Sequence, residues 1–143
     1  MQYPRFMGNP TSPVHKYMTS SPHSIGVDQP LVQAHSLMRE HDIRHLPVLS
    51  GGTLVGLLTE RDLHLIETLK DVDPAHVTVE EAMTAPVYCV APEAPLDEVV
   101  TTMAERKFGA AVVMRHGKVA GILTTVDVCK ALADLLRTRS GPA

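Results

Sequence analysis

One seven-residue pattern, Gly-x-x-Thr-x-x-Asp, contains the side chains of this protein that are best suited to bind a ligand. It occurs as GLLTERD at residues 56–62 and again as GILTTVD at residues 121–127. In both copies an apolar, β-like run meets a Thr that can cap a following helix, and the Asp comes three residues later. A strand, a turn and a helix start therefore bring a hydroxyl, a carboxylate and free backbone N–H groups to one place.

Two interpretations of these pairs, Thr59 with Asp62 and Thr124 with Asp127, are open. In the first, each pair is a capping box that satisfies the first N–H groups of its helix. In the second, each Asp accepts hydrogen bonds from two ribose hydroxyls, while the Thr and the helix N-terminus face a phosphate. The Gly of each copy has no Cβ and lets another group approach the strand. The two roles are compatible in one residue, and the direction of the Asp side chain distinguishes them.

The pattern belongs to a repeat that covers most of the chain. Both copies of the Asp keep an offset of 65 residues, since 127 − 62 = 65, and no gap is needed elsewhere. The same offset relates further residues: Met18-Thr19 to Met83-Thr84, Pro30 to Pro95, Met38 to Met103 and Gly52 to Gly117. A repeat of this length indicates a duplicated supersecondary unit.

Each copy has the same predicted order of elements, β-α-β-β-α after a short opening helix. In the first copy the pattern predicts an opening helix at 14–18, a strand at 24–27, a helix through 31–38, two strands at 46–49 and 53–58, and a closing helix at 60–69. In the second copy the corresponding elements are predicted at 79–83, 88–90, 96–103, 110–114, 118–123 and 125–136. We expect an α+β fold, resembling an α/β sandwich, in which two repeats related by pseudo-two-fold symmetry pack sheet to sheet, because each small sheet exposes an apolar face. The expected divisions are a flexible segment at 1–12 and repeats at 13–73 and 74–143, and the two repeats are expected to form one integrated module.

Composition excludes several classes of protein. The chain has 143 residues, a net charge of −3, 3% aromatic residues and no Trp, so neither a polyanion-binding surface nor a stacking platform for nucleic acid is expected. No apolar run approaches the roughly 18 residues that span a membrane, and the start lacks the apolar core of a signal peptide. Cys89 and Cys129 lie in apolar runs, which predicts buried thiols in a reducing, cytoplasmic protein.

No catalytic or metal-binding pattern is found. His41 and His45 are four residues apart near a helix end, but no H-E-x-x-H motif or partner Cys accompanies them. No base accompanies Cys89 in any known motif, and Thr with Asp alone does not activate water. We therefore expect a protein that is not an enzyme. Apolar residues in the two closing helices exceed what one small sheet covers and belong either to the core or to a dimer face: Leu63, Ile66, Leu69, Val128, Leu132 and Leu135.

With these features the chain resembles a tandem pair of cystathionine β-synthase (CBS) domains, called a Bateman module. The resemblance rests on the Met-Thr pairs, the RHLPV strand at 44–48 and both Gly-x-x-Thr-x-x-Asp segments, and it covers residues 14–136. It implies a regulatory sensor that binds AMP, ADP, ATP or S-adenosylmethionine in clefts between the repeats, forms a homodimer and acts on a separate, unidentified protein. The alternative is a dimerisation module whose pockets are vestigial and empty.

The resemblance also implies which residues line each pocket. One pocket would combine Thr124 and Asp127 with residues of the first repeat, and the other would combine Thr59 and Asp62 with residues of the second. The first-repeat residues are Thr19, His23, Ile43 and Arg44, and the second-repeat residues are Thr84, Tyr88, Phe108 and Gly109.

The two pockets are not expected to be equivalent. Arg44 corresponds to Gly109, since 109 − 44 = 65, so one pocket gains a guanidinium that can hold phosphate oxygens in pairs. We expect the Asp127 pocket to bind phosphorylated ligands more tightly, unless Arg44 is a solvated surface residue. Val112 stands where the first repeat has Pro47, a departure from the family's strand pattern.

Overall fold

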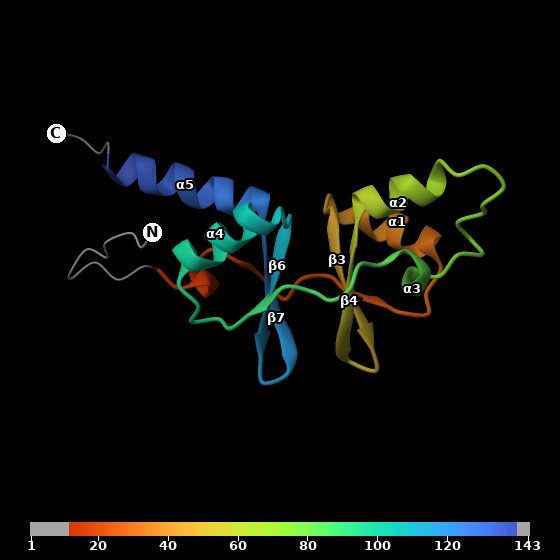
Figure 1. Cartoon of the computed structure of the whole chain (residues 1–143), viewed down its shortest axis with the longest axis horizontal. Coiled ribbons are helices and arrows are strands. Elements are labelled where there is room, and N and C mark those ends of the chain that lie inside the picture. The colour runs from red at the N-terminus through yellow and green to blue at the C-terminus, as the bar shows by residue number, and fades with distance from the viewer. Residues whose placement is uncertain (1–11, 140–143) are drawn as a thin grey trace.

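The computed structural model describes residues 12–139 and has two similar halves that lie side by side (Figure 1). The first half contains the sheet β2-β3-β4 and the second contains the sheet β1-β7-β6-β5. The elements of the first half are β2 (Ile25–Gly26), α1 (Leu31–His41), β3 (His45–Ser50), β4 (Thr53–Thr59), α2 (Glu60–Glu67) and α3 (Val79–Ala82). Those of the second half are the 3₁₀ helix η1 (Val14–Lys16), β1 (Thr19–Ser20), β5 (Cys89–Val90), α4 (Leu96–Arg106), β6 (Ala110–Arg115), β7 (Lys118–Thr124) and α5 (Thr125–Arg139).

The strands of the two halves pair in the same way. A short parallel strand, β2 or β5, lies beside the first strand of an antiparallel hairpin, β3–β4 or β6–β7. The hairpins turn at Gly51-Gly52 and at His116-Gly117, and all four residues have positive φ values between 51° and 85°. Two residues with positive φ give the turn whose twist matches that of the flanking strands. The predicted α+β fold of two β-α-β-β-α repeats is confirmed, and β4 lies near β7 where the halves meet.

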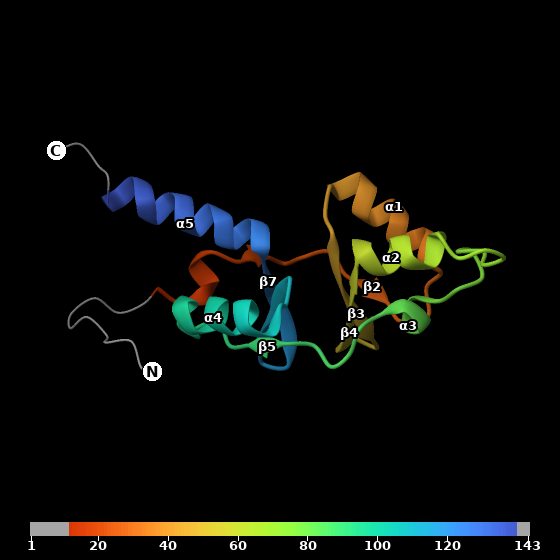
Figure 2. The same cartoon turned by 45° about the horizontal axis from the view of Figure 1, so that its top comes forward.

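The opening segment of each repeat belongs to the other half of the molecule. β1, which precedes the first repeat's own sheet, pairs with β7 of the second half, with Thr19 opposite Ile122. In the same manner Thr84 forms two backbone hydrogen bonds with Leu57 in β4. Two crossing segments, orange and green in Figures 1 and 2, therefore connect the halves. The halves are joined by exchanged segments rather than by a single linker.

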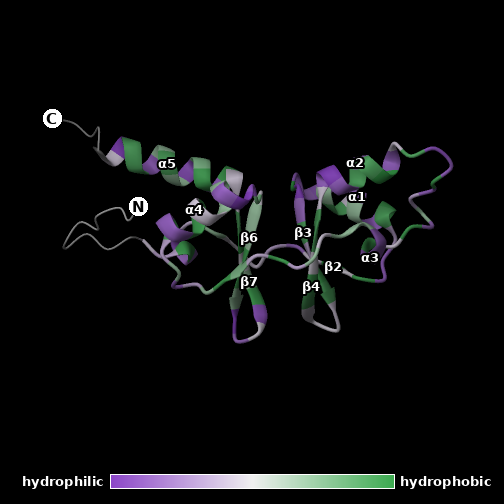
Figure 3. Ribbon diagram, viewed as in Figure 1, coloured by the Kyte–Doolittle hydropathy of each residue, from purple (hydrophilic) through white to green (hydrophobic). Residues whose placement is uncertain are grey.

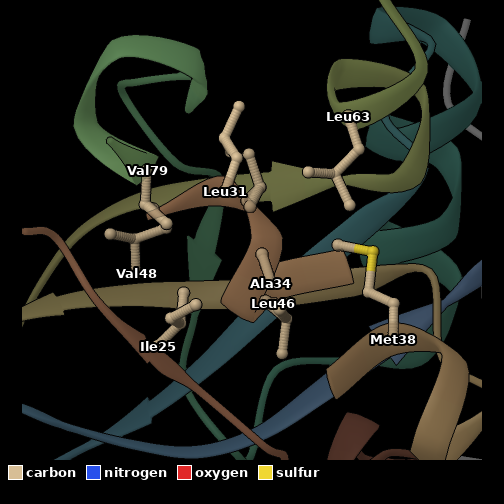
Figure 4. Packing of buried hydrophobic residues seen from close by; sticks show 9 residues of the cluster. Ile25, Leu31, Ala34, Met38, Leu46, Val48, Leu63 and Val79 are labelled. Carbon is tan, nitrogen blue, oxygen red and sulfur yellow. The ribbon is translucent and has the colours of Figure 1, made fainter. Parts of the chain in front are cut away.

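Each hydrophobic core includes a residue from such an exchanged segment. Val79 of α3 is fully buried in the first core, where Figure 4 shows it beside Val48 and Leu31. Val14 of η1 is fully buried in the second core, which also contains Leu123. Full burial of a valine side chain contributes about 1.5–3 kcal/mol to folding. Each core therefore uses side chains from both repeats.

The Gly of each Gly-x-x-Thr-x-x-Asp segment makes room for a methionine of the opposite repeat. A Cβ on Gly56 would overlap the sulfur of Met83, and one on Gly121 would overlap the sulfur of Met18. The group that approaches the strand is thus the Met of each Met-Thr pair. These glycines are explained by packing between the repeats.

The structure tests the predicted burial of the cysteines but not the predicted flexibility of the first segment. The segment at 1–12 lies outside the described residues except for Ser12. The prediction of buried thiols is wrong, because Cys89 and Cys129 are both exposed. Cys89 lies on β5, an edge strand with an open side, and Cys129 lies on an outer side of α5. Partial burial still raises the pKa of the Cys89 thiol.

Within residues 12–139, no helix has both the length and the apolar character needed to cross a membrane.

Substitution of Gly121 by Ala should destabilise the fold by about 1–3 kcal/mol, as overpacking of a tight contact does. The new Cβ would meet the sulfur of Met18 and would also lie 2.9 Å from the backbone oxygen of Thr19, which has little freedom to move. Gly56→Ala should cost less, because the three nearest atoms there all belong to the flexible Met83 side chain. Urea unfolding of both variants measures the difference, and equal losses would contradict this account.

Candidate functional site

The two strand-to-helix corners form capping boxes. At the first corner, the Thr59 N–H donates to Asp62 Oδ2 at 2.9 Å, and the Asp62 N–H donates to Thr59 Oγ1 at 3.1 Å. At the second corner, the Thr124 N–H donates to Asp127 Oδ2 at 2.9 Å, and the Asp127 N–H donates to Thr124 Oγ1 at 3.4 Å. The capping interpretation is therefore confirmed for both pairs. Binding of a ribose is a further role that these contacts do not test.

The second corner is joined to the first repeat by a side-chain hydrogen bond. The Thr19 hydroxyl lies 3.2 Å from Asp127 Oδ1 and 3.5 Å from Oδ2. Pairing of β1 with β7 places Thr19 at this distance, although the two residues are 108 positions apart. The structure thus brings together three residues that the resemblance assigned to one pocket, Thr19, Thr124 and Asp127.

The first corner lacks this link. Within residues 12–139, Thr84 bonds to Leu57 through its backbone, and its side chain forms no hydrogen bond to Asp62. Asp62 is half-buried, whereas Asp127 is only 7% exposed. The two corners have the same cap but differ in how tightly the carboxylate is enclosed.

The Asp62 and Asp127 carboxylates also differ in how many hydrogen-bond acceptor positions remain for a ligand. An ionised carboxylate has about four acceptor positions. Asp127 uses three of them, for the Thr124 N–H, the Thr124 hydroxyl and the Thr19 hydroxyl. Among the described residues, Asp62 uses one, for the Thr59 N–H. Asp62 thus keeps positions for two ribose hydroxyls, while at Asp127 about one position remains and a second hydroxyl would have to compete with Thr19.

His45 lies between the two corners, at the start of β3. The Gly109 backbone runs so close to it that a Cβ there would lie 3.2 Å from His45 Nε2. Burial lowers the pKa of His45, as does the Arg44 charge, while the Asp127, Asp62 and Glu60 carboxylates act in the opposite direction. The imidazole therefore senses charges from both corners. His45 was not among the predicted pocket residues. The signal that could have identified it is its repeat partner Ala110, which follows the small Gly109 and leaves room for the imidazole.

The Arg44 side chain is exposed to solvent. Its side chain is 75% exposed, and Nε lies 4.0 Å from Glu60 Oε2 in its own repeat. Its carbonyl oxygen also accepts a hydrogen bond from the Glu60 N–H at 2.9 Å. An exposed pair of this kind contributes little to stability, so the guanidinium is free to turn toward an anion. The phosphate-binding role of Arg44 stays a prediction.

Three further predicted pocket residues, His23, Tyr88 and Phe108, take part in ring contacts. His23 stacks on His41, with ring centroids 3.7 Å apart and planes 15° apart. At the corresponding place in the second repeat, Tyr88 contacts Phe108 at 5.4 Å with a 30° tilt. The structure thus brings Tyr88 and Phe108 together as expected, while His23 has His41 as its neighbour, a residue that was not assigned to the pocket.

Ile43 and Phe108 also line grooves between the two main helices of their own halves. The groove between α1 and α2 has a volume of about 500 Å³, and the groove between α4 and α5 has a volume of about 390 Å³. Neither groove contains Asp62 or Asp127. Over residues 12–139, no group of three or more His, Cys, Asp or Glu side chains is arranged to hold a metal ion.

Comparison with known proteins identifies the duplicated unit. The CBS domain family matches residues 14–65 and 79–134 of the chain. Hypoxic response protein 1 of Mycobacterium tuberculosis is 30% identical over 111 residues, which cover 77% of this chain and 78% of that protein. The crystal structure described as an acetoin utilization protein (AcuB) from Vibrio cholerae has a TM-score of 0.80 at 28% identity and covers 93% of this chain and 99% of its own.

Two similar solved structures carry adenosine-containing ligands. The CBS domain pair of protein MJ0100, in complex with 5′-methylthioadenosine and S-adenosyl-L-methionine, has a TM-score of 0.76 at 25% identity and covers 87% of this chain and 98% of its own. The structure of CBSX2 in complex with AMP has a TM-score of 0.76 at 25% identity, and the match covers 88% of this chain and 99% of the CBSX2 chain.

The hydrogen bond between Thr19 and Asp127 should be measurable as a coupling energy. In a double-mutant cycle with Thr19→Val and Asp127→Asn, we expect a coupling of about 1–2 kcal/mol, at the level of a partly exposed bond to a charged group. The same cycle with Thr84→Val and Asp62→Asn is the matched control, and its coupling should be near zero. Chemical denaturation gives all the values. Similar coupling in the two pairs would show that the corners are equivalent.

His45 should make stability depend on pH. Its pKa is lower in the folded protein, so the unfolded chain binds the proton more readily, and stability falls as the pH drops below about 6.5. Between about pH 7.5 and about pH 5.5, His45→Gln should lose less unfolding free energy than the wild type. The exposed His15→Gln variant is the control and should follow the wild type. An unchanged pH profile in His45→Gln would contradict the assignment.

Proposed function

The chain belongs to the CBS domain family, and from this premise we propose that it is a regulatory sensor that binds an adenosine-containing ligand between its halves. The observation that carries the proposal is the Thr19–Asp127 hydrogen bond, which ties a helix start of one repeat to the exchanged segment of the other. A ligand at this place contacts both halves together. Its binding energy then depends on how the halves are arranged, which is what a sensor requires.

The chemistry of the corners supports a sugar and a phosphate as the recognised groups. Asp62 keeps acceptor positions that suit ribose hydroxyls. The helix N-termini carry partial positive charge that favours a phosphate. Complexes of similar proteins with AMP and with S-adenosyl-L-methionine agree with this chemistry. We propose AMP, ADP or ATP as the ligand, with S-adenosylmethionine as a further one.

Binding has to leave the caps intact, because each Asp already holds its own helix start. A ligand hydroxyl is expected to add to the cap at Asp62 and to replace the Thr19 hydroxyl at Asp127. Loss of the Thr19–Asp127 hydrogen bond would weaken the contact between the halves. Ligand binding could then change how the two halves are arranged. Arg44 would supply the charge for a phosphorylated ligand.

The remaining parts of the proposal come from the family resemblance. The module acts without catalysis, as a cytoplasmic homodimer, on a separate protein whose identity the chain does not indicate. A second candidate is a dimerisation module with vestigial pockets. It is favoured by one observation, that the Asp127 carboxylate is almost completely buried and its acceptor positions are largely used by protein donors.

Calorimetric titration and thermal shift with adenosine, AMP, ADP, ATP and S-adenosylmethionine separate the two candidates. A sensor should bind at least one of these ligands and melt at a higher temperature, because a ligand at 100 times its Kd adds about 2.7 kcal/mol. Arg44→Ala should then weaken ADP binding about tenfold, equivalent to about 1.4 kcal/mol, and leave adenosine binding unchanged.

Arg115→Ala is the matched control, since Arg115 is also exposed and also lies 4.0 Å from a glutamate, Glu93, but sits at the far end of its hairpin. It should bind ADP like the wild type. If none of the five ligands binds, the sensor proposal fails and the dimerisation module is supported. If Arg44→Ala binds ADP with full affinity, Arg44 is a surface residue only.

A further inference from the structure

The two corners lie where the halves meet, and each one holds its carboxylate in the first turn of a helix. Figure 3 shows α2 and α5 beginning beside the boundary between the halves and running away from it, and the first turn of α2 is hydrophilic. The two carboxylates have different protein partners at their oxygens. The number of sugar hydroxyls that each corner can accept depends on these partners.

Asp127 has one carboxylate oxygen that is fully used and one that is half used. Its Oδ2 accepts hydrogen bonds from the Thr124 N–H at 2.9 Å and from the Thr124 hydroxyl at 3.1 Å. Its Oδ1 accepts a hydrogen bond from the Thr19 hydroxyl at 3.2 Å. Each oxygen of an ionised carboxylate offers about two acceptor positions. One position therefore remains at this corner, and it is on Oδ1.

Asp62 has acceptor positions left on both oxygens. Among the described residues its carboxylate accepts one hydrogen bond, from the Thr59 N–H to Oδ2 at 2.9 Å. Within the same part of the chain, neither the Thr59 hydroxyl nor the Thr84 side chain donates to it. Two neighbouring hydroxyls of a ribose can thus bind together, one to each oxygen, as in other bidentate contacts of a carboxylate.

We propose that Thr19 sets the sugar specificity of the second corner: the Asp127 corner binds adenine ribonucleotides and their deoxy forms about equally, while the Asp62 corner selects ribonucleotides. This specificity rests on the proposed function, since both corners are its nucleotide sites. It gives Thr19 a role that the family resemblance did not indicate. The Thr19 hydroxyl competes with the ligand for the carboxylate instead of binding the ligand.

The equal binding at Asp127 comes from an exchange of equivalent hydrogen bonds. One ribose hydroxyl takes the open position on Oδ1. A second hydroxyl bonds to this carboxylate only if it displaces the Thr19 hydroxyl, so one neutral donor to a charged acceptor replaces another. Thr19 is an exposed residue, and its displaced hydroxyl can bond to water instead. A deoxyribose has one hydroxyl fewer, needs no exchange and loses no affinity.

At Asp62 each ribose hydroxyl adds a hydrogen bond to a charged acceptor without replacing a protein donor. Loss of one such bond should weaken binding about tenfold to a hundredfold. The difference between the corners does not come from the cap, because both corners have the same capping box. It comes from the hydroxyls that additionally occupy Asp127.

Calorimetric titration with ribose and deoxyribose forms of the same nucleotides measures the selectivity of each corner. Asp127→Asn isolates the Asp62 corner, and Asp62→Asn isolates the Asp127 corner. Each protein is titrated with AMP, ADP and ATP and with their 2′-deoxy and 3′-deoxy forms. Asp127→Asn should bind the ribonucleotides about tenfold to a hundredfold more tightly than the deoxy forms. In Asp62→Asn the two affinities should differ by less than about threefold, because the exchange at Asp127 is nearly neutral.

Thr19→Val in the Asp62→Asn background is the decisive variant. Valine keeps the β-branched shape but frees an acceptor position on Asp127, so this protein should prefer ribonucleotides at least about tenfold. A merely structural role of Thr19 would not create selectivity when the hydroxyl is lost. Thr19→Ser keeps the hydroxyl and should remain non-selective.

Thr84→Val in the Asp127→Asn background is the matched control. Within residues 12–139 the Thr84 side chain makes no hydrogen bond to Asp62, so the selectivity should equal that of Asp127→Asn alone. Circular dichroism verifies that every variant is folded.

Three results would overturn the proposed role of Thr19 while the sensor function stands: equal selectivity at the two corners, unchanged selectivity after Thr19→Val, or a single-corner protein that binds no nucleotide although the wild type does. If the wild type itself binds none of these nucleotides, the sensor function fails and the specificity of the corners fails with it. The two failures are therefore observed separately.

Discussion

The structure depends on one constraint: neither half is complete without a segment of the other. Val14 and Val79, each from an opening segment, are fully buried in the core of the opposite half. Met18 and Met83 pack over Gly121 and Gly56 in the same exchanged manner. A side chain that is buried across the pseudo-two-fold axis couples the stability of the two halves. Separation of the halves would expose both cores, so the module is expected to respond to ligands as one unit.

The helix caps are tied to this exchange. Each Gly-x-x-Thr-x-x-Asp segment provides a glycine for the opposite methionine, and a Thr–Asp pair for its own helix. At the second corner, the exchanged Thr19 hydroxyl reaches the capping carboxylate itself. One short segment thus ends a strand, starts a helix and contacts the other repeat. A ligand that alters the Asp127 contacts acts directly on the connection between the halves.

Duplication has been followed by divergence in specific places. The two corners keep the same cap, but only Asp127 is enclosed and bonded to the opposite repeat within the described chain. The helical faces differ more, since one groove is lined by charged and His side chains and the other mainly by apolar ones. These differences arise although both repeats share the β-α-β-β-α order. The first corner retains acceptor capacity for a ligand.

The sequence by itself determined the repeat, the order of elements and the caps, because these depend on local spacing: a Thr three residues before an Asp, a Gly turn between apolar runs, and a constant offset of 65 residues. The exposure of Cys89 and Cys129 was predicted wrongly, since an apolar run does not reveal an edge strand or the outer side of a helix. The position of His45 between the corners and the stacking of His23 on His41 were decided by the tertiary structure. So was the direction of both Asp side chains. These features arise from contacts between residues that lie far apart along the chain, and local spacing carries no information about which segments are exchanged.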